Sequence, residues 1–362
     1  MDLVWYAADI KTGVVQAELP VYSSGGPIER TVSAAMSSQV TLQTKARTCP
    51  ADWYDLFARK RTMLVPVLDG DPLHGFIPFK PDNGDHDVPV TMMSFEHVLW
   101  SAYCRTHYFD GSVDESRILE TLITDVIAGR FGLDMEVTDC GRTSEQEYDY
   151  YEDRVVGAIA DELSGRLGGP EWTTRIRWAD DAHTTFAKVV EIGPRIGADV
   201  GVVLENAHLL ERSVPNDWTN FSNAIQAVGE GSGEDRPMSP LLVDAGAVER
   251  GEPIWEDRVL AATLDTESAL TEYGEAVLRA RAQGSKQWAM RLDLTRVGTP
   301  RPGRDFDAGD TVQMQLEPTH RDESSWFGPA RLIGWRMESS VNAVTSFSPV
   351  FWDPSELEVT PP

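Results

Sequence analysis

Residues 287–338 contain three runs in which apolar and polar side chains alternate: 287-QWAMRLDLT-295, 311-TVQMQL-316 and 333-IGWRME-338. Successive side chains of a β-strand point to opposite sides, so alternation with a period of two gives each run one face that can be buried. We therefore predict three strands of one closed sheet. The apolar faces consist of Trp288, Met290, Leu292 and Leu294, of Val312, Met314 and Leu316, and of Ile333, Trp335 and Met337.

The connections between these runs contain two candidate sites. Gly309-Asp310 stands immediately before the second run. Glycine adopts a positive φ without strain and aspartate can accept hydrogen bonds from nearby backbone N–H groups, so the pair predicts a structural turn that redirects the chain into the strand. The next connection, Glu317 to Pro329, carries Trp326 and Phe327 among charged residues. Two aromatic side chains on a polar loop indicate a candidate contact surface.

The composition is that of a folded protein with more than one domain. A length of 362 residues favours two or three domains, and 41% hydrophobic with 25% charged residues is ordinary for a folded chain. No apolar run approaches the ~20 residues that span a bilayer, so no membrane anchor is expected, and the first residues lack the basic start of a secretory signal. Cys49, Cys104 and Cys140 are widely spaced and predict buried thiols rather than a disulfide framework or a zinc site.

The formal net charge is −26, from 58 Asp and Glu against 32 Lys and Arg. A protein that holds phosphate backbones by counterion release needs a basic face, so stable nucleic-acid binding is not expected. The acidity is explained most simply by solubility. A functional alternative is a surface past which nucleic acid slides without adhering.

Short strands joined by polar turns are predicted for the first hundred residues. Trp5 to Val21 is typical of two strands around the turn Lys11-Thr12-Gly13, and Met63 to Phe79 of a second hairpin around Asp69-Gly70. Pro50 to Phe57 predicts one helical turn capped by Asp52. Residues 1–104 are therefore predicted to form an N-terminal β-barrel domain.

Helical periodicity begins after this region. Apolar stripes from Ile118 to Ile127, capped by Asp114, and from Val155 to Leu167 predict two helices. With a strand pair around Trp172 to Trp178, they predict an α+β middle domain at 105–185.

The remaining boundaries follow the return of strand patterns. We assign residues 186–228 to the first part of a second β-barrel, 229–286 to a loop and helix insertion, 287–350 to the second part of that barrel, and 351–362 to a C-terminal tail. A stripe from Leu270 to Leu278 predicts a helix that starts at Asp265 or Thr266, whereas Arg236 to Arg258 is predicted to be loop-rich. The predicted fold class is α+β, with two small β-barrel domains and α+β insertions.

No catalytic, cofactor-binding or metal-binding residues are predicted. The seven histidines form no H-x-x-x-H or H-E-x-x-H pattern, and no G-x-S-x-G marks a serine nucleophile. The glycine-rich segment Gly229 to Asp235 lacks the Lys-Ser/Thr of a phosphate-binding loop. Two carboxylates could act as acid and base on a glycan, but the sequence selects no pair.

Several short motifs, taken in order, resemble one family. In the first half they are 5-WYAADIKTG-13, 63-MLVP-66 followed by 69-DG-70, and 150-YYEDR-154; in the second half they are 223-NAIQAVGEG-231, 309-GDTV-312 and 331-RLIGW-335. Together they resemble the minor tail proteins that act as the tail hub in long-tailed phages of actinobacteria and, more distantly, the baseplate hub proteins of contractile-tailed phages. Residues 237–258 have no counterpart in this resemblance.

The resemblance implies a phage tail hub-like fold and a homotrimeric ring at the end of the tail tube. Three copies of two similar barrels would present six units, which would let a threefold tip meet a sixfold tube. The implied partners are further copies of the chain, a distal tail protein, a tape measure protein and tail-tip or receptor-binding proteins. The implied location is the virion tail tip after synthesis in the host cytoplasm, without cofactors or enzymatic activity. Two alternatives remain open: an acidic hydrolase of cell-wall glycans, and a carbohydrate-binding module that uses exposed aromatic side chains.

Overall fold

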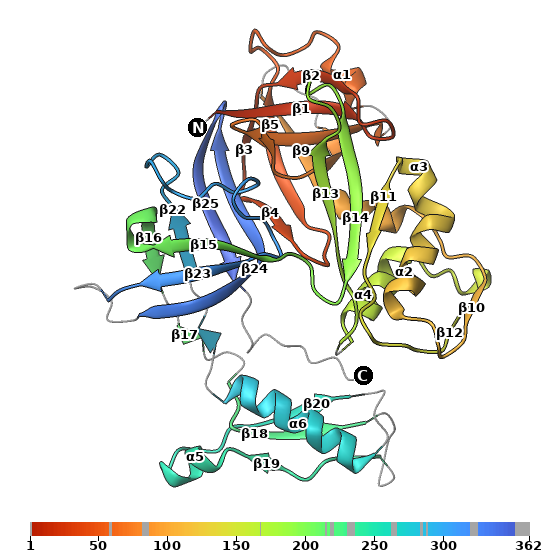
Figure 1. Ribbon diagram of the computed structural model, residues 1–362, viewed down its shortest axis with the longest axis vertical. Helices are drawn as coiled ribbons and strands as arrows, with labels where there is room; N and C mark the ends of the chain where they lie inside the picture. Colours follow the sequence, from red (N-terminus) through yellow and green to blue (C-terminus); the bar gives the residue numbers. More distant parts are fainter. Residues whose placement is uncertain are drawn as a thin grey trace. The chain divides into compact units, whose positions relative to one another are not determined.

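The computed structural model describes residues 2–57, 60–81, 87–166, 168–213, 216–217, 221–229, 236–261, 266–282, 285–286, 289–318 and 325–351. The chain divides into two compact units (Figure 1). Unit 1 consists of Met1–Ser164, Gly169–Arg212 and Met290–Val350, and unit 2 of Gly165–Gly168, Ser213–Ala289 and Phe351–Pro362. The fold combines helices and strands, and sheets dominate it, in agreement with the predicted α+β class.

The first sheet of unit 1 is built from the N-terminal strands in the order β2-β1-β6-β8-β9-β5-β3, with β7 paired to β6. All of its pairings are antiparallel. Buried side chains follow one another across one face, among them Leu19, Trp5, Leu64, Phe76 and Val90. The strands are β1 (Leu3–Asp9), β2 (Val15–Leu19), β3 (Val21–Ser23), β5 (Ser37–Gln43), β6 (Thr62–Leu68), β7 (Asp71–Pro72), β8 (Phe76–Pro81) and β9 (Asp87–Ser94).

This first sheet has to curl, because its two edge strands are neighbours in the chain. β2 ends at Leu19 and β3 begins at Val21, so one residue, Pro20, joins them. In a flat sheet six strand spacings would separate these edges by roughly 29 Å, whereas the two residue steps from Leu19 to Val21 span at most about 7 Å. The edges therefore meet at Pro20.

The second sheet of unit 1 follows the order β15-β23-β24-β25-β22-β16, and β4 pairs with β24. Its edge strands are also neighbours in the chain, since only the three-residue turn Asn206–His208 separates β15 from β16. This sheet is therefore curled as well. The strands are β4 (Ile28–Thr31), β15 (Asp199–Glu205), β16 (Leu209–Ser213), β22 (Ala289–Leu292), β23 (Thr311–Leu316), β24 (Trp326–Ser340) and β25 (Ala343–Phe351).

Strand β4 connects the two sheets. The chain leaves the first sheet after β3, pairs Ile28–Thr31 with Met337–Gly334 of β24, and returns to the first sheet as β5. The sequence assigned all of residues 1–104 to one barrel, and β4 departs from that assignment. The side chain of Arg30 consequently enters the structure from β4, beside the second sheet.

A helical region covers the other face of the first sheet. The three-stranded sheet β11-β14-β13 and the helices share one core with Met63, Val65 and Ile77 of the first sheet. Asp114 caps α2 as predicted, because its side chain accepts a hydrogen bond from Ser116 N. The elements are β10 (His107–Phe109), α2 (Glu115–Ile123), a π-helical turn (Thr124–Ala128), α3 (Gly129–Phe131), β11 (Asp134–Val137), β12 (Gln146–Tyr148), α4 (Val156–Ser164), β13 (Glu171–Trp178) and β14 (Phe186–Gly193), preceded by a 3-10 helix (Phe95–Ser101).

Unit 2 is a small α+β module in its described residues. Helix α6 packs on the sheet β19-β18-β20, with Ile225, Val259, Leu270 and Val277 in its core. Thr266, one of the two predicted helix starts, caps α6, because its side chain accepts a hydrogen bond from Ala269 N. The other predicted start, Asp265, lies outside the described residues. The elements are β17 (Asn216–Asp217), β18 (Ala224–Val228), β19 (Leu242–Val243), α5 (Ala245–Glu249), β20 (Glu256–Leu260), α6 (Glu267–Arg281) and β21 (Ser285–Lys286).

The pairing of two strands departs from the predicted second barrel. Strand β14 pairs with β11 and β13, because Trp178 and Phe186 begin a hairpin, and β18 pairs with β19 and β20 in unit 2. The segment Arg236 to Arg258, predicted to be loop-rich, also contains the short elements β19 and α5 and the first part of β20. Strands β18, β19 and β20 have two to five residues and carry too few alternations to reveal their partners, and the alternation of the eight-residue β14 does not say which sheet it joins.

The predicted loop around Trp326 and Phe327 is part of a strand. Strand β24 begins at Trp326, and its first residues pair with β23, with Leu316 opposite Trp326. The predicted face of the third run is also partly wrong: Leu332 is buried and Ile333 is half-buried, whereas Trp335 and Met337 are buried as predicted. The alternation shifts at Gly334, where the backbone of β4 approaches so closely that a Cβ on Gly334 would lie 2.2 Å from Arg30 O.

The helical turn predicted for Pro50 to Phe57 forms as α1 (Trp53–Leu56), but the Asp52 side chain makes no capping hydrogen bond.

The turn Gly309-Asp310 has the predicted geometry. Gly309 has a φ of 99°, and the Asp310 carboxylate accepts hydrogen bonds from Ala198 N (3.0 Å) and Asp307 N (2.8 Å). A Cβ on Gly309 would lie 2.9 Å from Ile196 O, and one on Gly197 would lie 2.2 Å from the carbonyl carbon of Gly309. The turn therefore lies in close backbone contact with the segment that joins β14 to β15.

We expect Gly309→Val to lower the free energy of unfolding by about 1 to 3 kcal/mol, because a β-branched residue is strained at this φ. Gly298→Val is the matched control: Gly298 has a φ of 92°, but open space surrounds the position of its Cβ. The loss at Gly309 should exceed the loss at Gly298, as measured by chemical denaturation. Equal losses would show that the contact with Ile196 is unimportant, and an unchanged Gly309→Val protein would contradict the turn.

Candidate functional site

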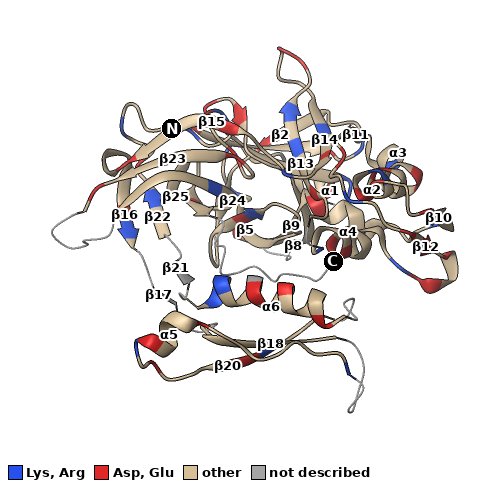
Figure 2. Ribbon diagram, turned by 60° about the horizontal axis from the view of Figure 1, so that its bottom comes forward, with Lys and Arg blue, Asp and Glu red and all other residues tan. Residues whose placement is uncertain are grey.

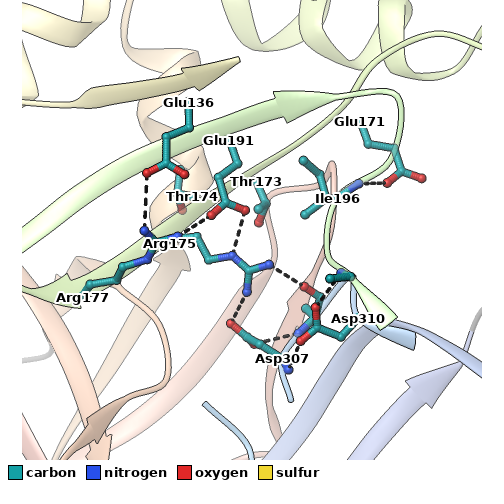
Figure 3. A network of polar contacts seen from close by, with 12 residues as sticks. Glu136, Glu171, Thr173, Thr174, Arg175, Arg177, Glu191, Ile196, Asp307 and Asp310 are labelled. Atoms are coloured by element: carbon teal, nitrogen blue, oxygen red, sulfur yellow. Dashed lines mark hydrogen bonds and ion pairs between the residues drawn. The ribbon is translucent and has the colours of Figure 1, made fainter. Parts of the chain in front are cut away.

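A network of ion pairs joins the sheets of unit 1 at Asp307, in the segment before β23 (Figure 3). Arg30 Nη1 donates to both carboxylate oxygens of Asp307 at 2.7 Å, and Arg175 Nη1 donates to Oδ2 at 2.5 Å. Arg30 is 1% exposed and the Arg175 and Asp307 side chains are 14% and 17% exposed. One carboxylate therefore pairs with two guanidinium groups from β4 and β13.

The network continues from Asp307 to the protein surface. Arg175 Nε donates to Glu191 of β14 at 2.9 Å, and Glu191 also accepts from Arg177 at 2.7 Å. Arg177 then reaches Glu136 of β11 at 3.4 Å. Charges of opposite sign thus alternate from Asp307 to an exposed end, where Arg177 and Glu136 are 51% and 56% exposed.

A second branch ties β13 to the turn region and to β24. Arg331 of β24 pairs with Glu171 of β13 through both guanidinium Nη atoms, with Nη1 at 2.6 Å from Oε1. Glu171 also accepts from Ile196 N at 2.7 Å, and Arg331 Nη2 donates to Ile196 O at 3.3 Å. The segment that packs against Gly309 is therefore held from both sides.

The interior end of the network is a buried pair, Glu96 and His74. Both side chains are fully buried, and His74 Nε2 lies 2.8 Å from Glu96 Oε2. The other Glu96 oxygen accepts from Thr174 N at 3.2 Å and Thr174 Oγ1 at 2.9 Å. Arg30 Nη2 donates to Thr174 O at 3.1 Å, which links this pair to Asp307.

The carboxylates of the network are held in their charged form. Burial opposes the charge on Asp307, but Arg30 and Arg175 outweigh it and lower the pKa of its carboxyl group to about 2. Burial likewise opposes the charge on Glu96, whose pKa is lowered to about 2 by His74 and Arg30. Burial lowers the pKa of His74, so we assign a neutral ring that donates from Nε2. Asp307, Glu96 and His74 therefore keep one protonation state near neutral pH, and the arrangement is suited to fixing geometry rather than to proton transfer.

The described residues contain no group of three or more His, Cys, Asp and Glu side chains placed to hold a metal ion. The three cysteines are free; Cys104 is buried as predicted, whereas Cys49 and Cys140 are only half-buried. In the part of the chain that the structure describes, no helix is long and apolar enough to cross a membrane.

The predicted site residues fall in two places. Gly309 and Asp310 adjoin the network, because Asp310 accepts from the backbone N–H of Asp307. Trp326 and Phe327 lie at the start of β24; Phe327 is 64% exposed and Trp326 is half-buried. The Phe327 side chain is accessible to a partner protein. The contact role of this pair stays a prediction.

Sequence reasoning did not find the ion pairs. Arg30 and Asp307 are separated by 277 positions, and Glu171 and Arg331 by 160. The available signal was the placement of Glu171, Arg175 and Arg177 at alternate positions along β13, where they share a side of the strand. Charged residues at alternate positions of a strand indicate either a face in contact with solvent or a face whose charges form ion pairs with other elements.

Comparison with known proteins shows a shared fold. No protein-family model and no curated protein matches the sequence. Among solved structures, the 43 kDa tail protein of prophage MuSo2 from Shewanella oneidensis aligns with a TM-score of 0.62 at 11% identity over 99% of both chains. A tail protein from Neisseria meningitidis aligns with a TM-score of 0.59 at 10% identity over 100% of both chains. A prophage tail protein from Listeria monocytogenes aligns with a TM-score of 0.53 at 11% identity, over 99% of this chain and 97% of that one. At the level of the fold, the resemblance to phage tail proteins is confirmed.

We expect Asp307→Ala to lower the free energy of unfolding by about 3 to 5 kcal/mol, because it leaves Arg30 and Arg175 buried without their shared carboxylate. Glu136→Ala is the control at the exposed end of the same network, where loss of a pair costs about 1 kcal/mol or less. Chemical denaturation of the two variants measures both changes. Similar small losses would show that the buried end of the network does not hold the sheets together.

Proposed function

We propose that this chain is a structural protein of a phage-type tail and forms the hub at the distal end of the tail tube. The observation that carries the proposal is the alignment with three tail proteins over essentially their whole lengths and the whole of this chain. Agreement over a complete chain at 10–11% identity means that the arrangement of strands persists while the side chains differ. The short motifs that resemble tail hub proteins point to the same role.

The two curled sheets of unit 1 are the proposed barrels of the hub. Each sheet places strands that are consecutive in the chain, β2 and β3 or β15 and β16, at its two edges. Three chains in a closed ring would then present six such modules to a sixfold tube. The division into domains at 1–104, 105–185, 186–228, 229–286, 287–350 and 351–362 belongs to this proposal. Three strands depart from it: β4 pairs in the second sheet, β14 in the sheet β11-β14-β13 and β18 in unit 2.

The proposed partners are further copies of the chain, a distal tail protein, a tape measure protein and tail-tip or receptor-binding proteins. The tail tip of the virion is the proposed location. The chain has 58 Asp and Glu against 32 Lys and Arg. This balance supports a hub that does not retain DNA, because basic side chains bind a phosphate backbone by releasing its counterions. The rigid junction around Asp307 suits a ring whose subunits must keep one shape.

We expect three copies of the chain per tail in purified particles of the phage or tail-like particle that encodes it. Quantitative mass spectrometry against the tail tube protein gives the ratio, and light scattering of the isolated protein gives its oligomeric mass. A count of six, or absence from purified particles, would contradict the hub.

We expect the isolated protein to release no soluble fragments from purified host cell wall under conditions in which a lysozyme control does. The proposal assigns it no catalytic residues, and two carboxylates of the ion-pair network, Glu96 and Asp307, are held by partners and have a pKa of about 2. Turnover abolished by a single Glu or Asp substitution would favour the glycan hydrolase instead.

A further inference from the structure

Two segments of the middle region form a narrow ribbon on the surface of unit 1. β10 pairs with β12 in antiparallel register, with Tyr108 opposite Glu147. The pairing extends beyond both strands: Cys104 N donates to Arg154 O at 2.8 Å, and Tyr103 forms a bridge with Val155. We call residues 103–109 together with 146–155 the tyrosine ribbon.

The inner face of the tyrosine ribbon is anchored in the core. Phe109 and Tyr148 are buried, at 8% and 0% exposure, and belong to the core cluster that contains α2 and α4. The side chains next to them along each strand must then point outward. Backbone pairing and this anchored face hold the outer face in place without a partner.

Four tyrosine rings of the ribbon are largely exposed in the part of the chain that the structure describes. Tyr103, Tyr108, Tyr150 and Tyr151 are 58%, 63%, 67% and 67% exposed. Tyr108 donates its hydroxyl to Glu145 at 2.9 Å, and Tyr151 donates to Asp149. These bonds orient the rings, and burying a prepared aromatic surface costs less side-chain entropy than ordering a mobile one.

The surroundings of these rings are strongly acidic. Residues 103–111 and 143–155 contain six carboxylates, Asp110, Glu145, Glu147, Asp149, Glu152 and Asp153, and two arginines, Arg105 and Arg154. Acidic residues follow the chain beside β12 in Figure 2. Aromatic faces beside carboxylates attract a guanidinium or ammonium group through both its charge and the ring quadrupole.

We propose that the outer face of the tyrosine ribbon docks a basic, arginine-containing polypeptide segment of a neighbouring protein. A contact of the same type occurs on the inner face of the ribbon, where Arg154 lies over the ring of the buried Tyr148 with its Cζ 5.2 Å from the centroid. A sugar would prefer a flat platform, whereas Tyr150 and Tyr151 meet edge to face at 77°. The charge balance selects a cationic partner and repels nucleic acid.

This inference deepens the proposed function by giving the chemistry of one partner. Its test uses the isolated protein, so its failure would leave the copy number in the particle as a separate measure of the hub. The probe is a short fluorescent peptide in which arginine alternates with serine, titrated by fluorescence anisotropy at about 0.15 M salt, where remote charges are screened. A peptide with citrulline in place of arginine is the neutral control.

The variant Tyr108→Ala/Tyr150→Ala/Tyr151→Ala changes no charge and should weaken arginine-peptide binding about tenfold. Glu145→Gln/Glu147→Gln/Glu152→Gln should weaken it as well. The matched control, Glu18→Gln/Glu256→Gln/Glu338→Gln, removes three exposed glutamates outside the ribbon and should change the affinity less than twofold. Circular dichroism and the melting temperature verify that each variant is folded.

Wild-type binding by the tyrosine variant would overturn the proposal. Equal losses from the two glutamate sets would also overturn it, because the peptide would then sense only overall charge. Equal binding of the citrulline peptide would exclude recognition of a cation, and displacement of the peptide by soluble cell-wall oligosaccharides would assign the surface to glycans instead.

Discussion

The geometry of unit 1 depends on one carboxylate shared between two arginines. Asp307 accepts from Arg30 on β4 and from Arg175 on β13, so a segment of the second sheet region, an N-terminal strand and the middle sheet converge on its two oxygens. All buried charges are compensated only when Asp307, Arg30 and Arg175 are all in place. Buried ion pairs add little net stability relative to apolar residues, but an incomplete set is costly. We infer that this network selects one arrangement of the sheets against others of similar burial.

The two curled sheets explain why such a selection is needed. A sheet whose edge strands are joined by Pro20 or by Asn206–His208 has to curl, and the curl alone does not define which sheet lies beside it. Apart from the pairing of β4 with β24 and the backbone contacts of Asp2 and Leu3 with Ala343 and Asn342, the sheets meet largely through side chains. Apolar packing alone tolerates small displacements. The network, the Glu171–Arg331 pair and the backbone contact of Gly197 with Gly309 add directional constraints at that place.

Alternation and turn chemistry were sufficient to predict the local elements of this chain. Val312, Met314 and Leu316 are all buried on β23, Asp114 and Thr266 cap the predicted helices, and Gly309 has the predicted positive φ. The partners of the strands could not be predicted in the same way. The pattern of Phe186 to Ile192 predicts a strand but does not say which sheet the strand joins. Its hairpin with the strand that ends at Trp178 determines the sheet. Ile28–Thr31 has four residues and one basic side chain, so its place beside β24, and with it the whole ion-pair network, had no local signal.

This chain shares its fold with tail proteins from three bacteria although the sequences are only 10–11% identical. What such chains must share is the order of strands and the crossings between sheets, which depend on alternation and a few close backbone approaches rather than on particular side chains. Surfaces are under no such requirement. Residues 103–111 and 143–153 contribute Cys104, Phe109 and Tyr148 to the core. Their exposed tyrosines and carboxylates are not required by the core and can be selected by what binds them. The order and pairing of strands therefore identify the fold, whereas the composition of an outward face depends on what binds it.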